Sequence, residues 1–135
     1  MKVTGGCHCG HITYEAEVNP ATIRVCHCTD CQKLTGTAFR ATIASLPGTF
    51  VLKSGTPKIY IKTAESGNKR GHAFCPECGT PIYSAATAPN PSTYGLRVGG
   101  IDERAQLAPA RQIWCRSALP WSMDLTAVER FERQP

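Results

Sequence analysis

Features that mark membrane-spanning, secreted or repetitive proteins are missing from the 135 residues of this chain. No stretch approaches the roughly 20 apolar residues needed to cross a bilayer, and the N-terminal MKVTGGCHCG lacks the apolar run of a signal peptide. There is no repeat of fixed long period and no low-complexity segment. The sequence therefore predicts a single domain over residues 1–135, with no membrane partner and a cytoplasmic location.

Long runs of one charge are also absent. Fifteen Lys and Arg stand against ten Asp and Glu, which gives a formal net charge of +5. The excess comes mainly from scattered arginines, namely Arg97, Arg104, Arg111 and Arg116. Net positive charge favours anionic ligands in general, but basic nucleic-acid-binding segments carry clustered Lys and Arg. We therefore do not expect a nucleic-acid partner, and the sequence indicates no oligomeric state.

A sustained helical stripe is missing, whereas short segments rich in β-branched and aromatic residues recur. They are HITYEAEV, FRATIASL, TFVLKSG, KIYIKT and YGLRVGGI. In the first, every second residue from Ile12 to Val18 is apolar, as in a half-buried strand, and KIYIKT alternates in the same way through Ile59 and Ile61. The tail LTAVERFERQP is compatible with a short helix or an edge strand. The pattern predicts a mainly β fold.

One short helix is expected in TDCQKLTG. Thr29 and Asp30 are both competent N-caps, and Gly36 is suited to end the helix. The N-terminus of a helix favours nearby negative charge. We therefore expect this helix to favour the thiolate forms of Cys28 and Cys31.

Eight cysteines are the most informative feature of the composition. A chain without an export signal meets a reducing thiol pool, which argues against a disulfide framework. The cysteine spacings are those of metal-binding turns. We therefore expect zinc; iron is the alternative metal, but tetrahedral thiolate sites favour zinc.

Two cysteine pairs together predict a closed, four-thiolate zinc site. Cys75 and Cys78 form a Cys-x-x-Cys turn in CPECG, where Gly79 lets backbone N–H groups approach the sulfurs. One such pair cannot close a tetrahedral site, and Cys7 and Cys9 in CHCG are the natural donors of the other two ligands. Loss of this structural zinc should unfold the protein.

The stretch CHCTDC places three further thiols, Cys26, Cys28 and Cys31, within six residues. No fourth cysteine remains nearby. A catalytic zinc site keeps three protein ligands and leaves one position for water or substrate. Zinc there can act as a Lewis acid, lower the pKa of bound water or coordinate a substrate thiolate. Three thiols therefore predict an open, catalytic zinc site.

A histidine that closes the triplet as a structural Cys₃His zinc site is the alternative. The chain offers His8, His11, His27 and His72. His27 is the weakest choice, because it lies between two ligands and its side chain should point away from the ion. We expect His8 and His27 either to contact the metal-binding cysteines without binding the ion or to lie on the surface. Cys115, in RQIWCRS, is expected to be a buried small apolar residue.

The order of the clusters GGCHCG, CHCTDCQKLTGTAF and FCPECGTPIY, followed by a tryptophan in ALPW, resembles the glutathione-dependent formaldehyde-activating enzyme family, which includes the centromere protein V type of domain. The resemblance runs from Gly5 to about Phe131. It implies a single β-tent domain of small coiled antiparallel sheets with two zinc ions per chain. The structural zinc would lie on Cys7, Cys9, Cys75 and Cys78, and the catalytic zinc on Cys26, Cys28 and Cys31.

The resemblance also implies a carbon–sulfur lyase activity. In the founding reaction, glutathione and formaldehyde condense to S-hydroxymethylglutathione. Glutathione, the expected co-substrate, carries two carboxylates, which Lys33 and Arg40 are predicted to orient. Trp121 is predicted to line the pocket, with a core position as the alternative. Many relatives carry Pro-x-x-His-Ile where this chain has PARQI with Gln112, so rate or substrate can differ.

A second function class stays open at this stage. It is a zinc-stabilised binding module for a protein or nucleic acid, in which both metals are structural and nothing is catalysed. The two classes differ at the triplet, because an enzyme needs an exchangeable fourth ligand there and a binding module does not.

Overall fold

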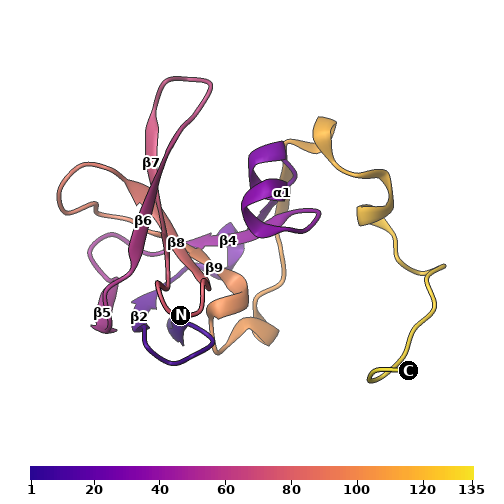
Figure 1. The fold of residues 1–135 in the computed structure, drawn as a ribbon, viewed down its shortest axis with the longest axis horizontal. Helices are drawn as coiled ribbons and strands as arrows, with labels where there is room; N and C mark the ends of the chain where they lie inside the picture. The colour runs from indigo at the N-terminus through magenta and orange to yellow at the C-terminus, as the bar shows by residue number, and fades with distance from the viewer.

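The computed structural model describes residues 1–135 as two β-sheets, one α-helix and several single-turn helices. The smaller sheet has the strand order β1-β2-β5 and is antiparallel throughout. Its strands are β1 (Lys2–Gly6), β2 (Thr13–Glu17) and β5 (Val51–Ser54). Figure 1 shows this sheet on the side of the molecule opposite the β6–β7 hairpin tip.

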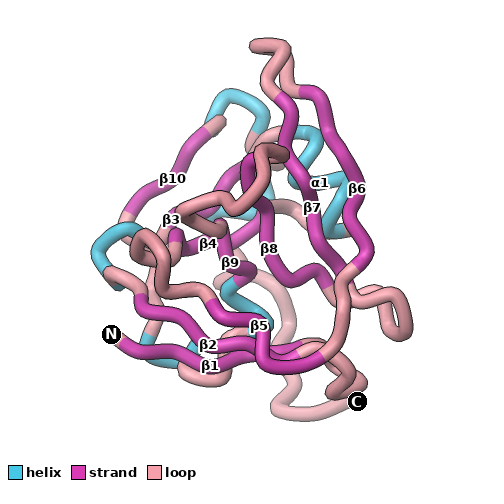
Figure 2. The backbone as a smooth tube through the Cα atoms, turned by 90° about the vertical axis from the view of Figure 1, so that its left-hand side faces the viewer, coloured by secondary structure: helices cyan, strands magenta, loops and turns pink.

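The larger sheet has seven strands in the order β10-β3-β4-β9-β8-β7-β6. They are β3 (Arg24–Cys26), β4 (Arg40–Ala44), β6 (Lys58–Thr63), β7 (Lys69–Phe74), β8 (Pro81–Ala86), β9 (Gly95–Arg97) and β10 (Arg111–Ile113). Figure 2 shows them rising above β1, β2 and β5. The predicted mainly β fold is confirmed, and the β10–β3 pair is the one parallel exception among antiparallel pairs.

Helical structure is limited to one α-helix and five 3₁₀ turns. The turns are η1 (Pro20–Thr22), η2 (Val98–Gly100), η3 (Arg104–Gln106), η4 (Cys115–Ser117) and η5 (Pro120–Met123). None of the helices has the length and apolar character that a membrane crossing requires. The fold therefore rests on sheet pairing and on the packing between sheets.

The predicted helix is confirmed as α1 (Thr29–Thr35), which ends before Gly36 as expected. Its N-cap is Cys28 rather than the predicted Thr29 or Asp30, because the Cys28 sulfur accepts a hydrogen bond from the Cys31 N–H. Gly36 follows in the left-handed conformation, with φ of +69°, and its N–H donates to the Gln32 carbonyl at 2.9 Å. Glycine adopts positive φ without steric cost, which explains the sharp end of the helix. The helix start therefore lies at the cysteine triplet.

The apolar core draws on both sheets. Val3 and Tyr14 of the smaller sheet join Ile43, Ile82 and Leu96 of the larger one in a single buried cluster. The predicted burial of one face of β2 is confirmed, because the apolar residues Ile12, Tyr14, Ala16 and Val18 are at most 3% exposed. Burial of such side chains supplies the main favourable free energy of folding.

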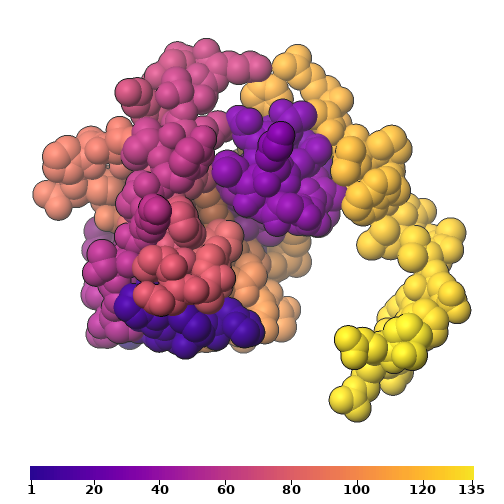
Figure 3. Space-filling model, in the orientation of Figure 1, coloured from indigo at the N-terminus to yellow at the C-terminus, as the bar shows by residue number.

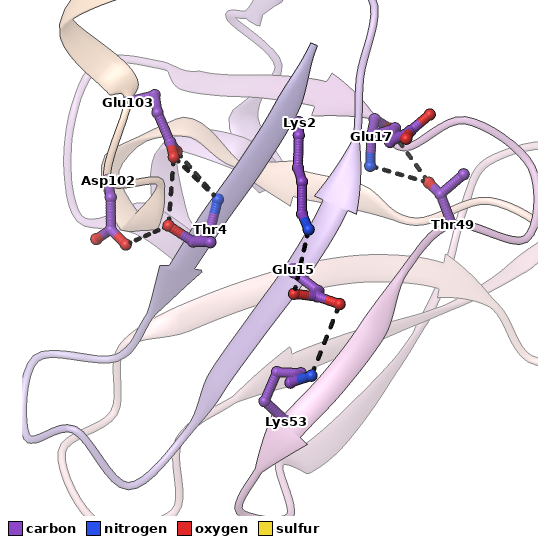
Figure 4. Close-up of polar contacts among 8 residues, drawn as sticks. All are labelled: Lys2, Thr4, Glu15, Glu17, Thr49, Lys53, Asp102 and Glu103. Carbon is purple, nitrogen blue, oxygen red and sulfur yellow. Dashed lines mark hydrogen bonds and ion pairs between the residues drawn. The ribbon is translucent and has the colours of Figure 1, made fainter.

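Polar contacts cover the outer face of the smaller sheet (Figure 4). The Glu15 carboxylate lies between Lys2 at 3.9 Å and Lys53 at 3.7 Å, which joins all three strands. The Thr4 N–H donates to Glu103 Oε2 at 3.0 Å and ties β1 to the segment after β9. Exposed ion pairs contribute little to stability, so these contacts add little to the backbone pairing of the strands.

Two expectations from the sequence are wrong. Ile59 and Ile61 of β6 are 43% and 48% exposed rather than half-buried core residues, because β6 is the edge strand of the larger sheet. The tail from residue 125 to 135 forms neither a helix nor a strand. Figures 1 and 3 show the C-terminal segment running out past α1 and away from the body of the molecule.

Candidate metal centres and the adjoining cavity

Four thiols meet where the β1–β2 and β7–β8 connections approach each other. The Sγ atoms of Cys7, Cys9, Cys75 and Cys78 all lie within 4.8 Å of one another. The Cys7–Cys9 and Cys9–Cys75 sulfur distances are 3.6 Å and 3.8 Å. A tetrahedral zinc ion with Zn–S bonds of about 2.3 Å separates its sulfurs by about 3.8 Å. The spacing of these thiols therefore suits zinc.

Hydrogen bonds in this four-thiol cluster favour the thiolate forms of Cys7 and Cys78, whereas burial and the neighbouring sulfurs raise the pKa of Cys9 to about 12. The Ile12 N–H donates to Cys7 Sγ at 3.1 Å. The hydroxyl of Thr80 lies 3.1 Å from Cys78 Sγ, and with the Thr80 N–H it lowers the pKa of Cys78 to about 5. Gly79 has φ of +79°, which shapes the turn between Cys78 and Thr80. Charged sulfurs are the form that binds a metal.

The second cluster is the predicted triplet. Cys26 ends β3, Cys28 caps α1, and Cys31 lies in the first turn of that helix. Their three Sγ atoms lie within 4.8 Å of one another, and no histidine nitrogen belongs to the group. The triplet thus offers three sulfur donors, all partly buried. This donor set fits a zinc ion that keeps one position for another ligand.

The pKa values of Cys28 and Cys31, the two thiols at the start of α1, shift in opposite directions. Burial opposes ionisation of Cys28, but the Cys31 N–H, 3.3 Å from its sulfur, helps to lower its pKa. Burial and the neighbouring sulfurs of Cys28 and Cys26 instead raise the pKa of Cys31 to about 12. The lowered pKa of Cys28 agrees with the expected thiolate, whereas at Cys31 burial and the neighbouring sulfurs act against it. Full ionisation of the triplet needs a cation among the sulfurs.

The imidazole ring of His27 is buried and has Gln112 as a hydrogen-bond partner. Its ring is 1% exposed, and its Nε2 lies 2.8 Å from Gln112 Oε1. Of the two positions expected for these histidines, His8 takes the surface one, and burial excludes the surface one for His27. Gln112 therefore positions the ring that lies between two of the triplet cysteines in sequence.

A cavity of about 400 Å³ adjoins the triplet. Five cationic side chains and no carboxylate line it together with the three thiols; the cations are Arg24, Arg40, Lys62, Arg70 and Arg97. Lys62 Nζ contacts Asp30 Oδ2 at 2.8 Å, which raises the pKa of this lysine. The cavity is therefore strongly positive and suited to an anionic ligand.

Arg40, His72 and Arg97 form a group that lines this cavity and also a neighbouring one of about 310 Å³. Arg97 Nη2 donates to His72 Nδ1 at 3.1 Å, and Arg40 Nη1 lies 3.5 Å from the same nitrogen. Burial, followed by the charges of Arg97 and Arg40, lowers the pKa of His72 to about 4. The ring is therefore neutral near pH 7, with its proton on Nε2.

The predicted glutathione contacts take different positions. Arg40 lines the cavity, whereas Lys33 is exposed on α1 and is not among the lining residues. Trp121 is 58% exposed, so the alternative of a core position is wrong. Trp114, which the sequence analysis did not select, lines the cavity. Cys115 is exposed and outside both clusters, so its predicted burial is also wrong. It begins η4, which leads into the C-terminal segment that leaves the body of the molecule.

Known proteins share both the fold and the sequence pattern of this chain. A crystal structure of a Rhodobacter sphaeroides protein aligns with a TM-score of 0.61 at 21% identity, over 81% of this chain and 98% of that one. Residues 2–117 match the family model described as glutathione-dependent formaldehyde-activating enzyme, so the match ends before Trp121 and short of Phe131. The chain therefore belongs to the glutathione-dependent formaldehyde-activating enzyme family.

Proposed function

We propose that the protein is a zinc-dependent, carbon–sulfur lyase-like enzyme that acts on a glutathione adduct of formaldehyde or another small aldehyde. Family membership supports glutathione-dependent formaldehyde activation in general. The observation that carries the proposal is a group of three thiols, without a fourth protein ligand, beside a cationic cavity. A cytoplasmic location is part of the proposal, because free thiols persist in a reducing compartment.

Two zinc ions per chain are part of this proposal. Cys7, Cys9, Cys75 and Cys78 would hold the structural ion, and Cys26, Cys28 and Cys31 the catalytic one. A bound zinc ion supplies a Lewis acid and lowers the pKa of a coordinated thiol or water. The open position of the second site would admit the substrate.

The reaction is the addition of a thiol to a carbonyl group. The sulfur of glutathione forms a bond to the aldehyde carbon, the C=O π bond breaks, and the thiol proton passes to the oxygen. The reverse reaction breaks the same C–S bond. The cavity cations Arg24 and Arg70 would hold the carboxylates of the tripeptide, and Arg40 on the cavity wall would face the adduct. Lys33 and Trp121 do not line the cavity and would contact glutathione only outside it.

Native mass spectrometry of the reduced protein, with and without glutathione, gives the first test. Two zinc ions and a glutathione adduct are expected, followed by exchange between ¹³C-formaldehyde and S-hydroxymethylglutathione measured by NMR. Cys28→Ser should lower the enzymatic exchange rate at least about a hundredfold, because the triplet loses a ligand. The variant should keep the fold, since Cys28 lies outside the buried cluster.

Cys115→Ser is the matched control, because Cys115 is exposed and belongs to neither cluster. It should retain both zinc ions and the full exchange rate. One tightly held zinc ion, no glutathione adduct and no effect of Cys28→Ser would instead favour the zinc-stabilised binding module.

A further inference from the structure

Two guanidinium groups are buried together without an acidic partner. Arg40 and Arg97 are each 7% exposed, and both approach the same nitrogen of His72. The Nε atom of each arginine has no hydrogen-bond partner, and neither side chain takes part in an ion pair. Burying like charges without a counter-charge is costly. This pair therefore lacks an anion.

The groups around the cavity do not supply enough negative charge. Three thiolates and one zinc ion would together carry a charge of about −1. Five cationic side chains line the cavity, and only Lys62 is paired, with Asp30. A positive excess is left for the ligand. A ligand with several negative charges would therefore match the cavity best.

We propose that Arg40 and Arg97 bind a carboxylate carried by the aldehyde, so that the preferred adduct is the hemithioacetal of glutathione with a 2-oxo acid of the glyoxylate type. The inference rests on the proposed function and names the substrate class at the same site. The addition balances as for formaldehyde: the C–S bond forms, the C=O π bond breaks and the thiol proton moves to the oxygen. No oxidant or reductant is needed.

The position of the arginines favours the aldehyde side of the adduct. Its carboxylate lies two bonds from the sulfur, whereas the carboxylates of glutathione lie at the two ends of the tripeptide. Arg40 and Arg97 line the same cavity as Cys31 and the other two thiols of the triplet. Arg24 and Arg70 are exposed and available to the tripeptide ends. The buried pair is thus left for an anion near the reacting sulfur.

Isothermal titration of the zinc-loaded full chain tests the inference with stable thioethers. The probes are S-carboxymethylglutathione, its neutral amide S-carbamoylmethylglutathione, and S-methylglutathione. Wild-type protein should bind the acid about ten- to a hundredfold more tightly than the amide, since charge-assisted hydrogen bonds are strong. Arg97→Gln should reduce this preference to less than about threefold, and Arg97→Lys should leave an intermediate preference.

Arg111→Gln is the matched control, because Arg111 is exposed and does not line this cavity. It should keep the wild-type preference. Zinc content and thermal unfolding verify the fold of each variant; if Arg97→Gln does not fold, Arg97→Lys and Arg40→Gln decide the test.

Equal affinity of the wild-type protein for acid and amide would overturn the inference while leaving the proposed function intact. The same holds if Arg97→Gln weakens all three probes by one factor, since the arginines would then serve the tripeptide. If Arg97→Gln keeps the preference for the acid over the amide but binds less zinc, Arg40 and Arg97 serve as counter-charges for the thiolates. That result also overturns the inference. If no probe binds zinc-loaded protein, the proposed function fails as well.

Discussion

Arg97 on β9 donates from Nη2 to Nδ1 of His72 on β7, at a distance of 3.1 Å. The two strands are not neighbours, because β8 lies between them in the sheet. The long arginine side chain therefore reaches across a strand, and Arg97 Nη1 also donates to Thr42 Oγ1 on β4 at 3.2 Å. One side chain links three strands at the cavity wall.

His72 should make stability depend on pH. Its pKa is about 4 in the folded protein against 6.5 ordinarily, so the unfolded chain binds a proton that the folded chain does not. The resulting stability is complete above about pH 6.5 and is lost as the pH falls towards 4. Because the ring is only half-buried, solvent screening should limit the effect to about 1 kcal/mol.

Denaturant unfolding at pH 7, 6 and 5 measures this effect. His72→Gln removes the titrating ring, so its free energy of unfolding should fall less with pH than that of the wild-type protein. Between pH 7 and 8 the two proteins should show the same slope. Equal slopes between pH 7 and 5 as well would contradict the prediction.

Cys75→Ser should unfold the protein. Cys75 is completely buried, belongs to the core cluster and contributes to the four-thiol cluster. Structural zinc binding is worth about 10–16 kcal/mol, which is comparable to the whole stability of a typical domain, about 5–15 kcal/mol. Far-UV circular dichroism should show no cooperative transition for this variant, and the same should hold for wild-type protein treated with a zinc chelator. A folded Cys75→Ser protein with two zinc ions would contradict the structural role.

Gln112→Ala should lower the free energy of unfolding by about 1–3 kcal/mol. The substitution leaves Nε2 of the buried His27 ring without its partner, and an unsatisfied buried polar group costs about that much. Urea denaturation measures the change. Gln134→Ala, in the exposed tail, is the control and should be neutral. A neutral Gln112→Ala would mean that water replaces the amide.

Deletion of residues 124–135 should leave stability within about 0.5 kcal/mol of the full chain. Leu125, Val128 and Phe131 are each more than half exposed, so their removal takes little apolar surface out of the core. Thermal unfolding and zinc content measure the outcome. A longer deletion from residue 118 also removes Trp121, and comparing glutathione affinity between the two tests that contact separately. A large loss of stability in the shorter deletion would show that the tail packs against the protein.

Local sequence patterns predicted the structure correctly where an element depends only on its neighbouring residues in the chain. The end of α1 at Gly36 and the alternation along β2 depend on neighbouring residues in the chain, and both were predicted correctly. The N-cap was not, because Cys28 takes the place expected for Thr29 or Asp30. The alternation in β6 was misleading, because burial depends on what covers a strand and β6 is an edge strand. Strands of three residues, such as β3 and β10, are too short to show any period.

The cysteine clusters and the cavity differ in how far the sequence determines them. Ligand counting grouped the seven clustered thiols in the same way as the structure does. The cationic wall could not be found in this way, because Arg97 reaches the site through the pairing of β9 with β4, where it lies opposite Thr42. Nothing near Arg97 in sequence distinguishes it from the other scattered arginines.

The two thiol clusters differ in the length of chain that they close. The triplet lies within six consecutive residues, whereas Cys9 and Cys75 are 66 positions apart. Closing a long loop costs more conformational entropy than closing a short one. During refolding, the triplet can therefore capture an ion before the distant turns have met. When zinc is scarce, we therefore expect the triplet to bind its ion first. The chain would then carry one ion and stay unfolded until the four-thiol cluster binds the second.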